Sequence, residues 1–260
     1  MILTSTSISV PARSETRPER GKPPFRPLKG RYGRGRALLQ SLRTALLCFL
    51  LFPVATMSQS LAQTQTQTQA AARTLKLVAL GDSLTAGYNL PGSAAFPPVL
   101  EQALRQKGIA VEIVNAGVSG DTVQGGLERL DWSVAEGTDG VILELGANDA
   151  LRGLDPAMTR KGLEAIVTRL KARGIPVLLA GMYAPRNLGP DYAKRFDAIY
   201  PELAKNHGLV LYPFFLEGIA GDRALNQPDL LHPTAEGVRV IVRNILPTVE
   251  RFLSTLPAKP

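Results

Sequence analysis

The stretch Leu75-Lys-Leu-Val-Ala-Leu80-Gly81-Asp82-Ser83-Leu84 is the part of the sequence on which the fold prediction rests. Its first six residues are apolar except for Lys76, and Gly81 closes the run, which is typical of a short buried strand. A chemically rich segment then follows the strand directly. This order predicts a strand that delivers polar side chains to one edge of a sheet.

Four further apolar runs predict strands, at residues 111–114, 140–145, 177–180 and 209–212. Residues with helical spacing lie between and after them, at 97–107, 127–135, 156–173, 191–206 and 233–253. Strands that alternate with helices indicate parallel βαβ units, with helices on both faces of the sheet. We therefore predict an α/β fold whose site lies at the carboxyl ends of the strands.

The net charge of +8 does not belong to this predicted domain. Residues 1–43 contain ten Lys/Arg and two acidic residues, so residues 63–260 keep 20 residues of each sign. A neutral domain has no global field that would attract a polyanion. We expect no nucleic-acid partner.

The basic residues form the start of a predicted export leader over residues 1–62. A short apolar run at 45–55 follows the last arginine, and Ser60-Leu61-Ala62 fits a cleavage site. The run is shorter than the ~20 residues that a spanning helix needs. We therefore expect a periplasmic or secreted protein, cleaved near Ala62, whose mature domain does not insert stably into a membrane; retention of the leader as an anchor is the alternative.

The organisation after the leader is simple. Residues 63–74 alternate Thr and Gln in part and predict a flexible linker, and residues 75–257 predict one folded domain. The only cysteine is Cys48, so the mature region has no disulfide, no Cys nucleophile and no Cys-zinc site. Residues 213–231 show little regular pattern, which is typical of a functional or mobile segment.

Three short polar segments follow predicted strands: Gly81-Asp82-Ser83-Leu84, the Gly120 segment at 115–121, and Gly146-Ala147-Asn148-Asp149. They offer a hydroxyl, an unobstructed backbone N–H and a side-chain amide, respectively. Taken alone, each one favours an ordinary turn or helix cap over a reactive group.

A fourth segment, Asp229-Leu-Leu-His232-Pro233, precedes the last predicted helix. The chain has only two histidines, and His207 is followed by Gly208 at a predicted helix end, a usual place for a cap. His232 stands three residues after Asp229, so the carboxylate can reach the imidazole. An isolated pair of this kind is also typical of a surface cap.

Together the four segments supply what a serine nucleophile needs, namely a base, an orienting acid and donors for an oxyanion. In this combination the chain resembles the SGNH (GDSL) hydrolases, in the bacterial thioesterase I, lysophospholipase and arylesterase branch. The matching stretches span about residues 75–255: Gly81-Asp-Ser-Leu-Thr-Ala-Gly-Tyr88, Asn115-Ala-Gly-Val-Ser-Gly-Asp-Thr122, Leu143-Glu-Leu-Gly-Ala-Asn-Asp149 and Asp229-Leu-Leu-His232.

The resemblance implies a three-layer α/β/α, flavodoxin-like fold with a five-stranded parallel sheet. It implies that Ser83 is the nucleophile, His232 the base and Asp229 the acid that orients it. The N–H groups of Ser83 and Gly120 and the side chain of Asn148 would form the oxyanion hole. No cofactor and no metal is expected.

Two departures from the family pattern concern substrate preference. Ala147 stands where this branch often has a second glycine, and Leu230-Leu231 replaces the more usual Gly-Ile before the histidine. The segment after the fourth strand matches a mobile substrate loop in position, with Met182, Tyr183, Pro185 and Asn187 as candidate contacts; an ordinary connection is the equal alternative for each.

We therefore expect a serine esterase for small acyl or aryl esters, with thioesters and lysophospholipids as further candidates, in a monomer or weak oligomer. A carbohydrate O-acetyl esterase would use the same groups, and a non-catalytic binding module could share the fold. A phosphate-binding loop is excluded because no Gly-Lys-Ser/Thr follows the first strand.

Overall fold

The computed structural model describes residues 73–257 of the chain. The predicted leader at 1–62 and the linker at 63–74, apart from its last two residues, lie outside the described residues, as does Cys48. Export and cleavage near Ala62 thus remain predictions.

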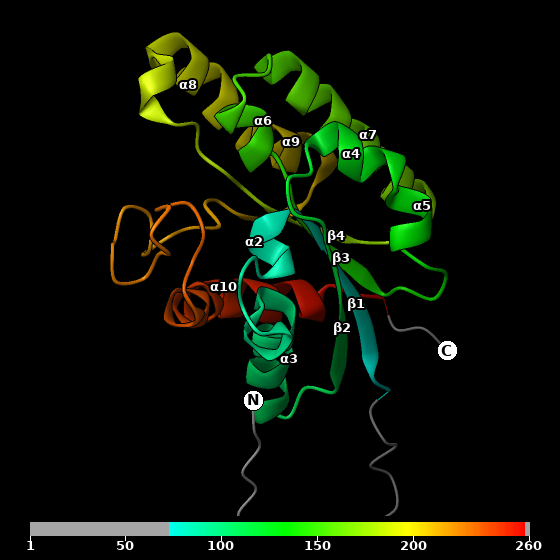
Figure 1. Cartoon of the computed structure of the whole chain (residues 1–260). Helices are drawn as coiled ribbons and strands as arrows, with labels where there is room; N and C mark the ends of the chain where they lie inside the picture. Colours follow the sequence, from blue (N-terminus) through cyan, green and yellow to red (C-terminus); the bar gives the residue numbers. More distant parts are fainter. Residues whose placement is uncertain (1–72, 258–260) are drawn as a thin grey trace, which may run out of the picture. The chain divides into compact units, whose positions relative to one another are not determined.

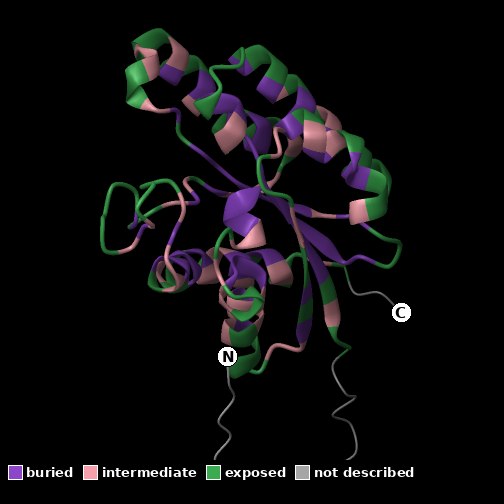
Figure 2. Cartoon of the chain, viewed as in Figure 1, coloured by how far each residue is buried: buried purple, intermediate pink, exposed green. Residues whose placement is uncertain are grey.

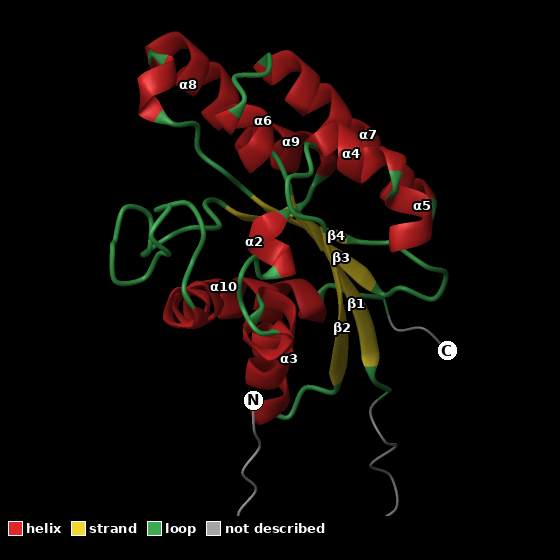
Figure 3. Cartoon of the chain, viewed as in Figure 1, coloured by secondary structure: helices red, strands yellow, loops and turns green. Residues whose placement is uncertain are grey.

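The centre of the described part is a parallel sheet of five strands, as predicted (Figure 3). The strands are β1 (Leu75–Gly81), β2 (Val111–Gly117), β3 (Gly140–Glu144), β4 (Val177–Ala180) and β5 (Val210–Tyr212). Their spatial order is β2-β1-β3-β4-β5, and every neighbouring pair is parallel. The chain reverses its direction of winding at β1 and β3, where an open α/β sheet forms its ligand crevice.

Helices cover both faces of this sheet, which confirms the three-layer prediction (Figure 1). On one face lie α3 (Phe96–Gln106) and α10 (Ala235–Ser254). The opposite face carries α4 (Val123–Glu128), α5 (Leu130–Ser133), α7 (Pro156–Ala172), α8 (Pro190–Asp197) and α9 (Ile199–His207). Short helical turns complete the fold: α2 (Ser83–Ala86), η1 (Gly92–Ala94), α6 (Ala147–Leu151) and η2 (Arg186–Leu188).

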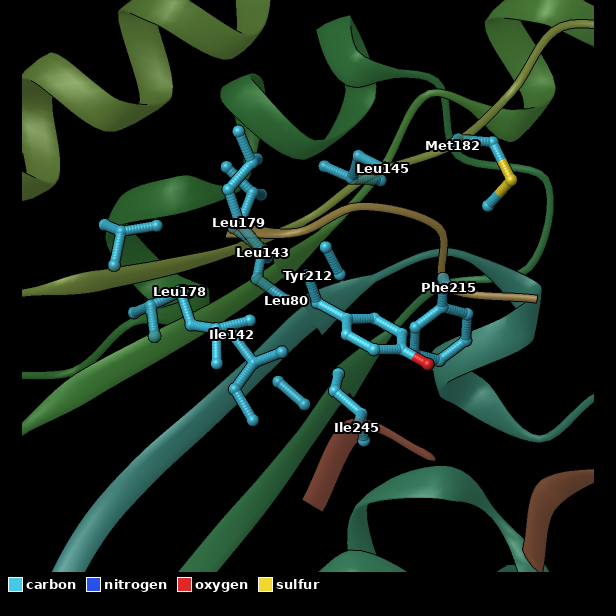
Figure 4. Packing of buried hydrophobic residues seen from close by; sticks show 14 of the residues in the cluster. Leu80, Ile142, Leu143, Leu145, Leu178, Leu179, Met182, Tyr212, Phe215 and Ile245 are labelled. Carbon is cyan, nitrogen blue, oxygen red and sulfur yellow. The ribbon is translucent and has the colours of Figure 1, made fainter. Parts of the chain in front are cut away.

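Strands β3 and β4, and β1 from Leu77 onward, are buried because both faces of the sheet are covered, so they read as continuous apolar runs (Figure 2). The edge strand β2 instead contains both buried and exposed residues. Leu80, Leu143 and Leu179 occupy one row of the register across β1, β3 and β4. Figure 4 shows this row packed in the same core as Ile245 of α10 and Phe215 after β5. The apolar core therefore holds rigid the strand ends that carry the polar segments.

Two predicted helices are each divided in two. The helix predicted at 191–206 breaks between α8 and α9, because Pro201 has no N–H to donate to the carbonyl of Asp197, four residues earlier. The helix predicted at 127–135 is replaced by α4 and α5, which meet at Arg129. The last helix starts at Ala235 rather than Pro233, because Thr234 caps it through a bond from the Gly237 N–H.

The short helices α2 and α6 lie where the sequence favours an ordinary turn or helix cap. With four and five residues they are too short for hydrophobic periodicity to reveal them. Strand β2 is longer than predicted and runs to Gly117, pairing with β1 as far as Gly81. A Cβ on Gly117 would lie 2.3 Å from the backbone nitrogen of Ala86, so only glycine lets α2 pack this closely.

Residues 213–234, between β5 and α10, contain turns and one isolated bridge but no helix (Figure 3). The bridge joins Asn226 to Pro233. The Asn226 side-chain amide also donates to the carbonyls of Ile219 and Asp222, at 2.6 and 2.7 Å. Side-chain bonds thus replace regular structure in the segment that ends at the last polar motif.

Candidate active site

Ser83 is the first residue of α2 and follows β1 after a single intervening residue, Asp82. Asp82 caps the helix, because its Oδ1 accepts a hydrogen bond from the Leu84 N–H at 3.0 Å. Ser83 itself is 8% exposed and lines a cavity. The strand and the cap together point a nearly buried serine at the carboxyl edge of the sheet.

A second buried carboxyl group, that of Glu144 at the end of β3, lies beneath this turn. Its Oε2 accepts hydrogen bonds from the Thr85 hydroxyl at 2.8 Å and the Asp82 N–H at 3.4 Å. Burial, and secondarily the charge of Asp82, raises the pKa of Glu144 well above its usual range. Burial also raises the pKa of Asp82, to about 6. The turn that carries Ser83 is therefore built on two desolvated carboxyl groups.

Asn148 lies in α6, directly after β3, and reaches across to the serine turn. Its Nδ2 donates to Asp82 Oδ2 at 3.1 Å and to the carbonyl of Asp121 at 3.0 Å. The following residue, Asp149, braces the helix, accepting bonds from the Val123 N–H and the Thr159 hydroxyl. Asn148 is thus held in place by the ends of three strands, and it lines the cavity beside Ser83.

Gly120 lies in the turn after β2, with a φ of +84° that strongly favours glycine. Its carbonyl accepts a hydrogen bond from Arg152 at 2.7 Å. Because the neighbouring Asp121 carbonyl is bonded to Asn148, this turn is adjacent to the Asn148 amide. Gly120 is not among the residues that line the cavity.

Arg129 connects the strand ends that carry these groups. Its guanidinium is buried and donates to Asp121 Oδ2 at 2.6 Å and to the carbonyls of Ala116 and Gly81 at 2.9 and 2.8 Å. One charged side chain thereby fixes the turns after β1 and β2 against each other. Its inward direction also accounts for the break between α4 and α5.

The structure brings His232 and Asp229 to Ser83 from the other end of the chain. His232 Nε2 lies 2.9 Å from Ser83 Oγ, and His232 Nδ1 lies 2.8 Å from Asp229 Oδ2. Asp229 Oδ1 accepts the N–H groups of Leu231 and His232. Burial alone would raise the pKa of Asp229, but the bonds from the His232 side chain and these two N–H groups outweigh it and lower the pKa to about 2. Asp229 is therefore an anion beside the imidazole.

Two contacts hold the His232 segment against the serine segment. Gln227 Nε2 donates to the carbonyls of Tyr88 at 2.8 Å and Pro233 at 3.0 Å. The Tyr88 ring lies over the imidazole of His232, with 4.4 Å between the ring centroids. The second histidine, His207, ends α9 and lies 3.4 Å from Glu164, away from this cluster.

A cavity of about 460 Å³ opens beside Ser83 and His232. Most of the side chains that line it are apolar, and they come from α2, α6, the segment after β4 and residues 213–232. They include Leu84, Leu151, Met182, Tyr183, Phe214, Leu216, Leu230 and Leu231. The polar lining groups are fewer: Ser83, Asn148 and His232 beside the reacting position, with Arg186 and Asn226 elsewhere in the lining, so the cavity suits a mostly apolar molecule with one polar reacting group.

Three of the four residues predicted for the substrate loop line this cavity, namely Met182, Tyr183 and Pro185, whereas Asn187 does not. Tyr183 stacks on Phe214 with 4.6 Å between the centroids. The adjacent Arg186, which also lines the cavity, lies over the Tyr183 ring and pairs with Asp197 at 2.6 Å. The loop is thus tied to α8 at one end and to the core at the other, where Met182 is buried.

Sequence reasoning missed the groups that support the site: Glu144, Arg129, Gln227 and the ring of Tyr88. Tyr88 and Glu144 fall inside matching family stretches, which is a usable signal for them. The sequence contains no comparable signal for Gln227, because its partner Tyr88 is 139 residues away.

Residues 73–257 contain neither a candidate metal centre nor a candidate membrane-spanning helix. In that range no group of three or more His, Cys, Asp or Glu side chains is arranged to hold a metal ion. Nor does any of its helices combine the length and apolarity required to cross a membrane.

Known proteins share both the sequence and this fold. The GDSL-like Lipase/Acylhydrolase family matches residues 79–240. Esterase TesA of Pseudomonas aeruginosa is 38% identical over 198 residues, which cover 76% of this chain and 98% of that protein. An arylesterase of Vibrio mimicus is 40% identical, over 62% of this chain and 81% of its own. Thioesterase 1/protease 1/lysophospholipase L1 of Escherichia coli K12 is 41% identical, over 64% and 78%.

Solved structures of esterases have the same fold as this chain. The crystal structure of TesA superposes with a TM-score of 0.65 at 36% identity, covering 68% of this chain and 99% of the other. AlinE4, described as an SGNH-hydrolase family esterase, gives 0.59 at 46% identity, covering 72% and 98%. The chain therefore belongs to the GDSL-like lipase/acylhydrolase family and is a carboxylic ester hydrolase of the SGNH type.

Proposed function

We propose that Ser83 is the nucleophile of this esterase, that His232 is its general base and that Asp229 orients His232. The observation that carries the proposal is the continuous chain from Ser83 Oγ through His232 to Asp229, with successive distances of 2.9 and 2.8 Å. The first lies within the range over which a base can take the proton of a nucleophile, and the second within hydrogen-bond range of the carboxylate that orients the base.

In the first half of the reaction, His232 Nε2 takes the hydroxyl proton as Ser83 Oγ attacks the ester carbonyl. The negative charge on the carbonyl oxygen is then stabilised by donors that we assign to the Ser83 N–H, the Gly120 N–H and Asn148 Nδ2. Asn148 already uses both amide hydrogens on Asp82 and Asp121, so the oxyanion must share one of them. His232 finally protonates the leaving alcohol, which leaves an acyl group on Ser83.

In the second half, His232 removes a proton from water, and the hydroxide attacks the acyl-enzyme. The carboxylic acid leaves as Ser83 regains its proton from His232. Asp229 remains ionised throughout and stabilises the imidazolium, consistent with the low pKa of its carboxyl group.

We propose small esters with apolar acyl or aryl groups as the substrates. The mostly apolar cavity of about 460 Å³ supports this class, and Met182, Tyr183 and Pro185 are its proposed loop contacts. The similar proteins are named esterase, arylesterase and thioesterase/lysophospholipase, so thioesters and lysophospholipids belong in the same substrate panel.

Replacement of the nucleophile tests the proposal. Ser83→Ala should reduce kcat for p-nitrophenyl acetate by about 10⁴- to 10⁶-fold and abolish the initial burst of p-nitrophenol, while circular dichroism and Tm stay close to the original. A variant that folds and hydrolyses the ester at the original rate would contradict the assignment.

We also propose that the enzyme is exported, because residues 1–62 have the charge and apolar pattern of a leader. N-terminal sequencing of the protein from its native host should then find a start near Gln63. A start within residues 1–43 would show that the leader is retained.

A further inference from the structure

Leu230 has an unusual backbone conformation within the motif that carries the base. Its φ is +59°, in the left-handed region that leucine avoids. Among the described residues, 73–257, one other non-glycine residue has positive φ, and it is Asn89, a residue type that tolerates the region. The strain at Leu230 is therefore a specific feature of this turn.

The hydrogen bonds of the turn account for the conformation. The Leu230 N–H donates to the carbonyl of Gln227 at 2.9 Å, and Asp229 Oδ1 accepts the next two N–H groups, those of Leu231 and His232. This tight turn brings the imidazole to Ser83. Glycine would satisfy the turn without strain, so the backbone gives no reason for a leucine.

Packing in the hydrophobic core does not explain the leucine at position 230 either. Leu230 and Leu231 are 40% and 47% exposed, and neither is part of the buried cluster nor of the partly buried residues packed on it. Both line the cavity that contains Ser83 and His232. Both side chains therefore border the space in which the ester would lie.

Other exposed apolar residues line the same cavity from separate segments. Leu151 of α6 is 49% exposed and Tyr183 after β4 is 42% exposed. An alkyl or aryl group in the cavity would cover part of this apolar surface and would be stabilised by its removal from water. A strained residue beside a reactive group is retained for what it contributes there.

We infer that Leu230 is a specificity-determining residue, which forms the apolar wall beside His232 against which the alkyl or aryl group of the ester packs. The inference rests on the proposed function, because it requires that the ester react at Ser83. It adds a reason for the departure from glycine at this position.

The test compares Leu230→Gly with a matched control, Asn89→Gly. Both substitutions put glycine at a positive-φ position, but only the first removes a cavity side chain. Two substrate series are needed, p-nitrophenyl acetate against octanoate for the acyl group, and ethyl acetate against octyl acetate for the alcohol. Leu230→Asn, which also tolerates positive φ, serves as a second variant without the apolar wall.

We expect Leu230→Gly and Leu230→Asn to lower the long-to-short ratio of kcat/KM by about 5- to 20-fold in one series. That series identifies which group contacts Leu230. The rate with the short ester should change less than about threefold, and Tm of Leu230→Gly should not fall, since the strain is relieved. Asn89→Gly should keep both ratios.

Unchanged ratios in both series would overturn the inference. So would an equal loss with short and long esters, because Leu230 would then act through the position of His232. The proposed function fails by a different result, namely Ser83→Ala retaining activity on the short esters.

Discussion

The two halves of the site are held in opposite ways. The half with Ser83 and Asn148 is built into the edge of the sheet, where Asp82 is 0% and Glu144 1% exposed. Hydrogen bonds from Thr85 to Glu144 and from Asn148 to Asp82 link the strand ends there. The half with Asp229 and His232 lies on a segment without helix or strand, next to two exposed leucines. Besides the contact of His232 with Ser83, the hydrogen bond from Gln227 to Tyr88 and the ring of Tyr88 over His232 tie it to the nucleophile side.

This difference separates two tasks. Groups that attack the carbonyl and stabilise the oxyanion must be fixed before the substrate arrives, because reorganisation of donors in the transition state is costly. Buried charge and strand ends provide that rigidity. The base loop, in contrast, also forms a wall of the substrate cavity, where variation in side chains changes preference without loss of the reacting groups.

Among variants that keep Ser83, His232 and Asp229, the largest effect is expected on the rigid half, from Asn148→Ala. Removal of one oxyanion donor costs about 3–4 kcal/mol, or ~10²- to 10³-fold in kcat. KM should change little, because the donor is used mainly in the transition state. Steady-state kinetics with p-nitrophenyl acetate measures this, with the exposed Asn206→Ala as control. A fall below threefold in kcat would remove Asn148 from the oxyanion hole.

The buried carboxyl of Asp82 predicts a pH dependence of stability. Its pKa is raised to about 6 by burial, so between about pH 4 and 6 the folded protein binds more protons at this site than the unfolded chain. Stability from this group is therefore highest below about pH 4 and is lost as the pH rises through 6. Asp82→Asn has no ionisable group at this position and therefore lacks this pH dependence of stability.

We expect the free energy of unfolding of Asp82→Asn, relative to that of the original protein, to increase by about 2–3 kcal/mol between pH 4 and 8, so that the variant becomes relatively more stable. Urea unfolding at both pH values measures it. The exposed Asp191→Asn should show no such trend. Parallel pH curves for Asp82→Asn and the original protein would contradict a raised pKa.

The smallest effect is expected where the two halves are joined. Gln227→Met keeps the length of the side chain but removes both hydrogen bonds, each worth about 0.5–1.5 kcal/mol. Gln227 is a positioning residue, so kcat should fall about 3- to 10-fold while KM for acetate esters is unchanged. An unchanged kcat would show that the base loop holds its place without this bridge.

Much of the fold could be predicted because its signals are local. The apolar run of β1 and the four runs like it are short, and four of the five are bounded by glycine or proline. Asp155-Pro156 marks the start of α7, where Asp155 does cap the helix. The breaks at Arg129 and Ala198 could not be predicted from periodicity. They depend on a buried guanidinium and on one missing N–H.

The candidate site likewise contains residues that could be predicted from the sequence and residues that could not. Ser83, Asn148 and the Asp229–His232 spacing could be identified because each follows a predicted strand or precedes a helix. The pairing of Glu144 with Thr85, and the bonds of Gln227 to Tyr88 and Pro233, could not, because tertiary contact across many residues leaves no spacing to read. The strain at Leu230 is visible only in its backbone angles.

The central claim, that Ser83 is the nucleophile, is tested most directly by covalent trapping. The protein is treated with an ethyl p-nitrophenyl alkylphosphonate, and the modified residue is located by mass spectrometry. We predict about one equivalent of p-nitrophenol, on the order of one reactive serine per chain, with the adduct on Ser83 in the tryptic peptide 77–105 and none in Ser83→Ala. An adduct on any other residue, or full inhibition of Ser83→Ala esterase activity by the same reagent, would contradict the account.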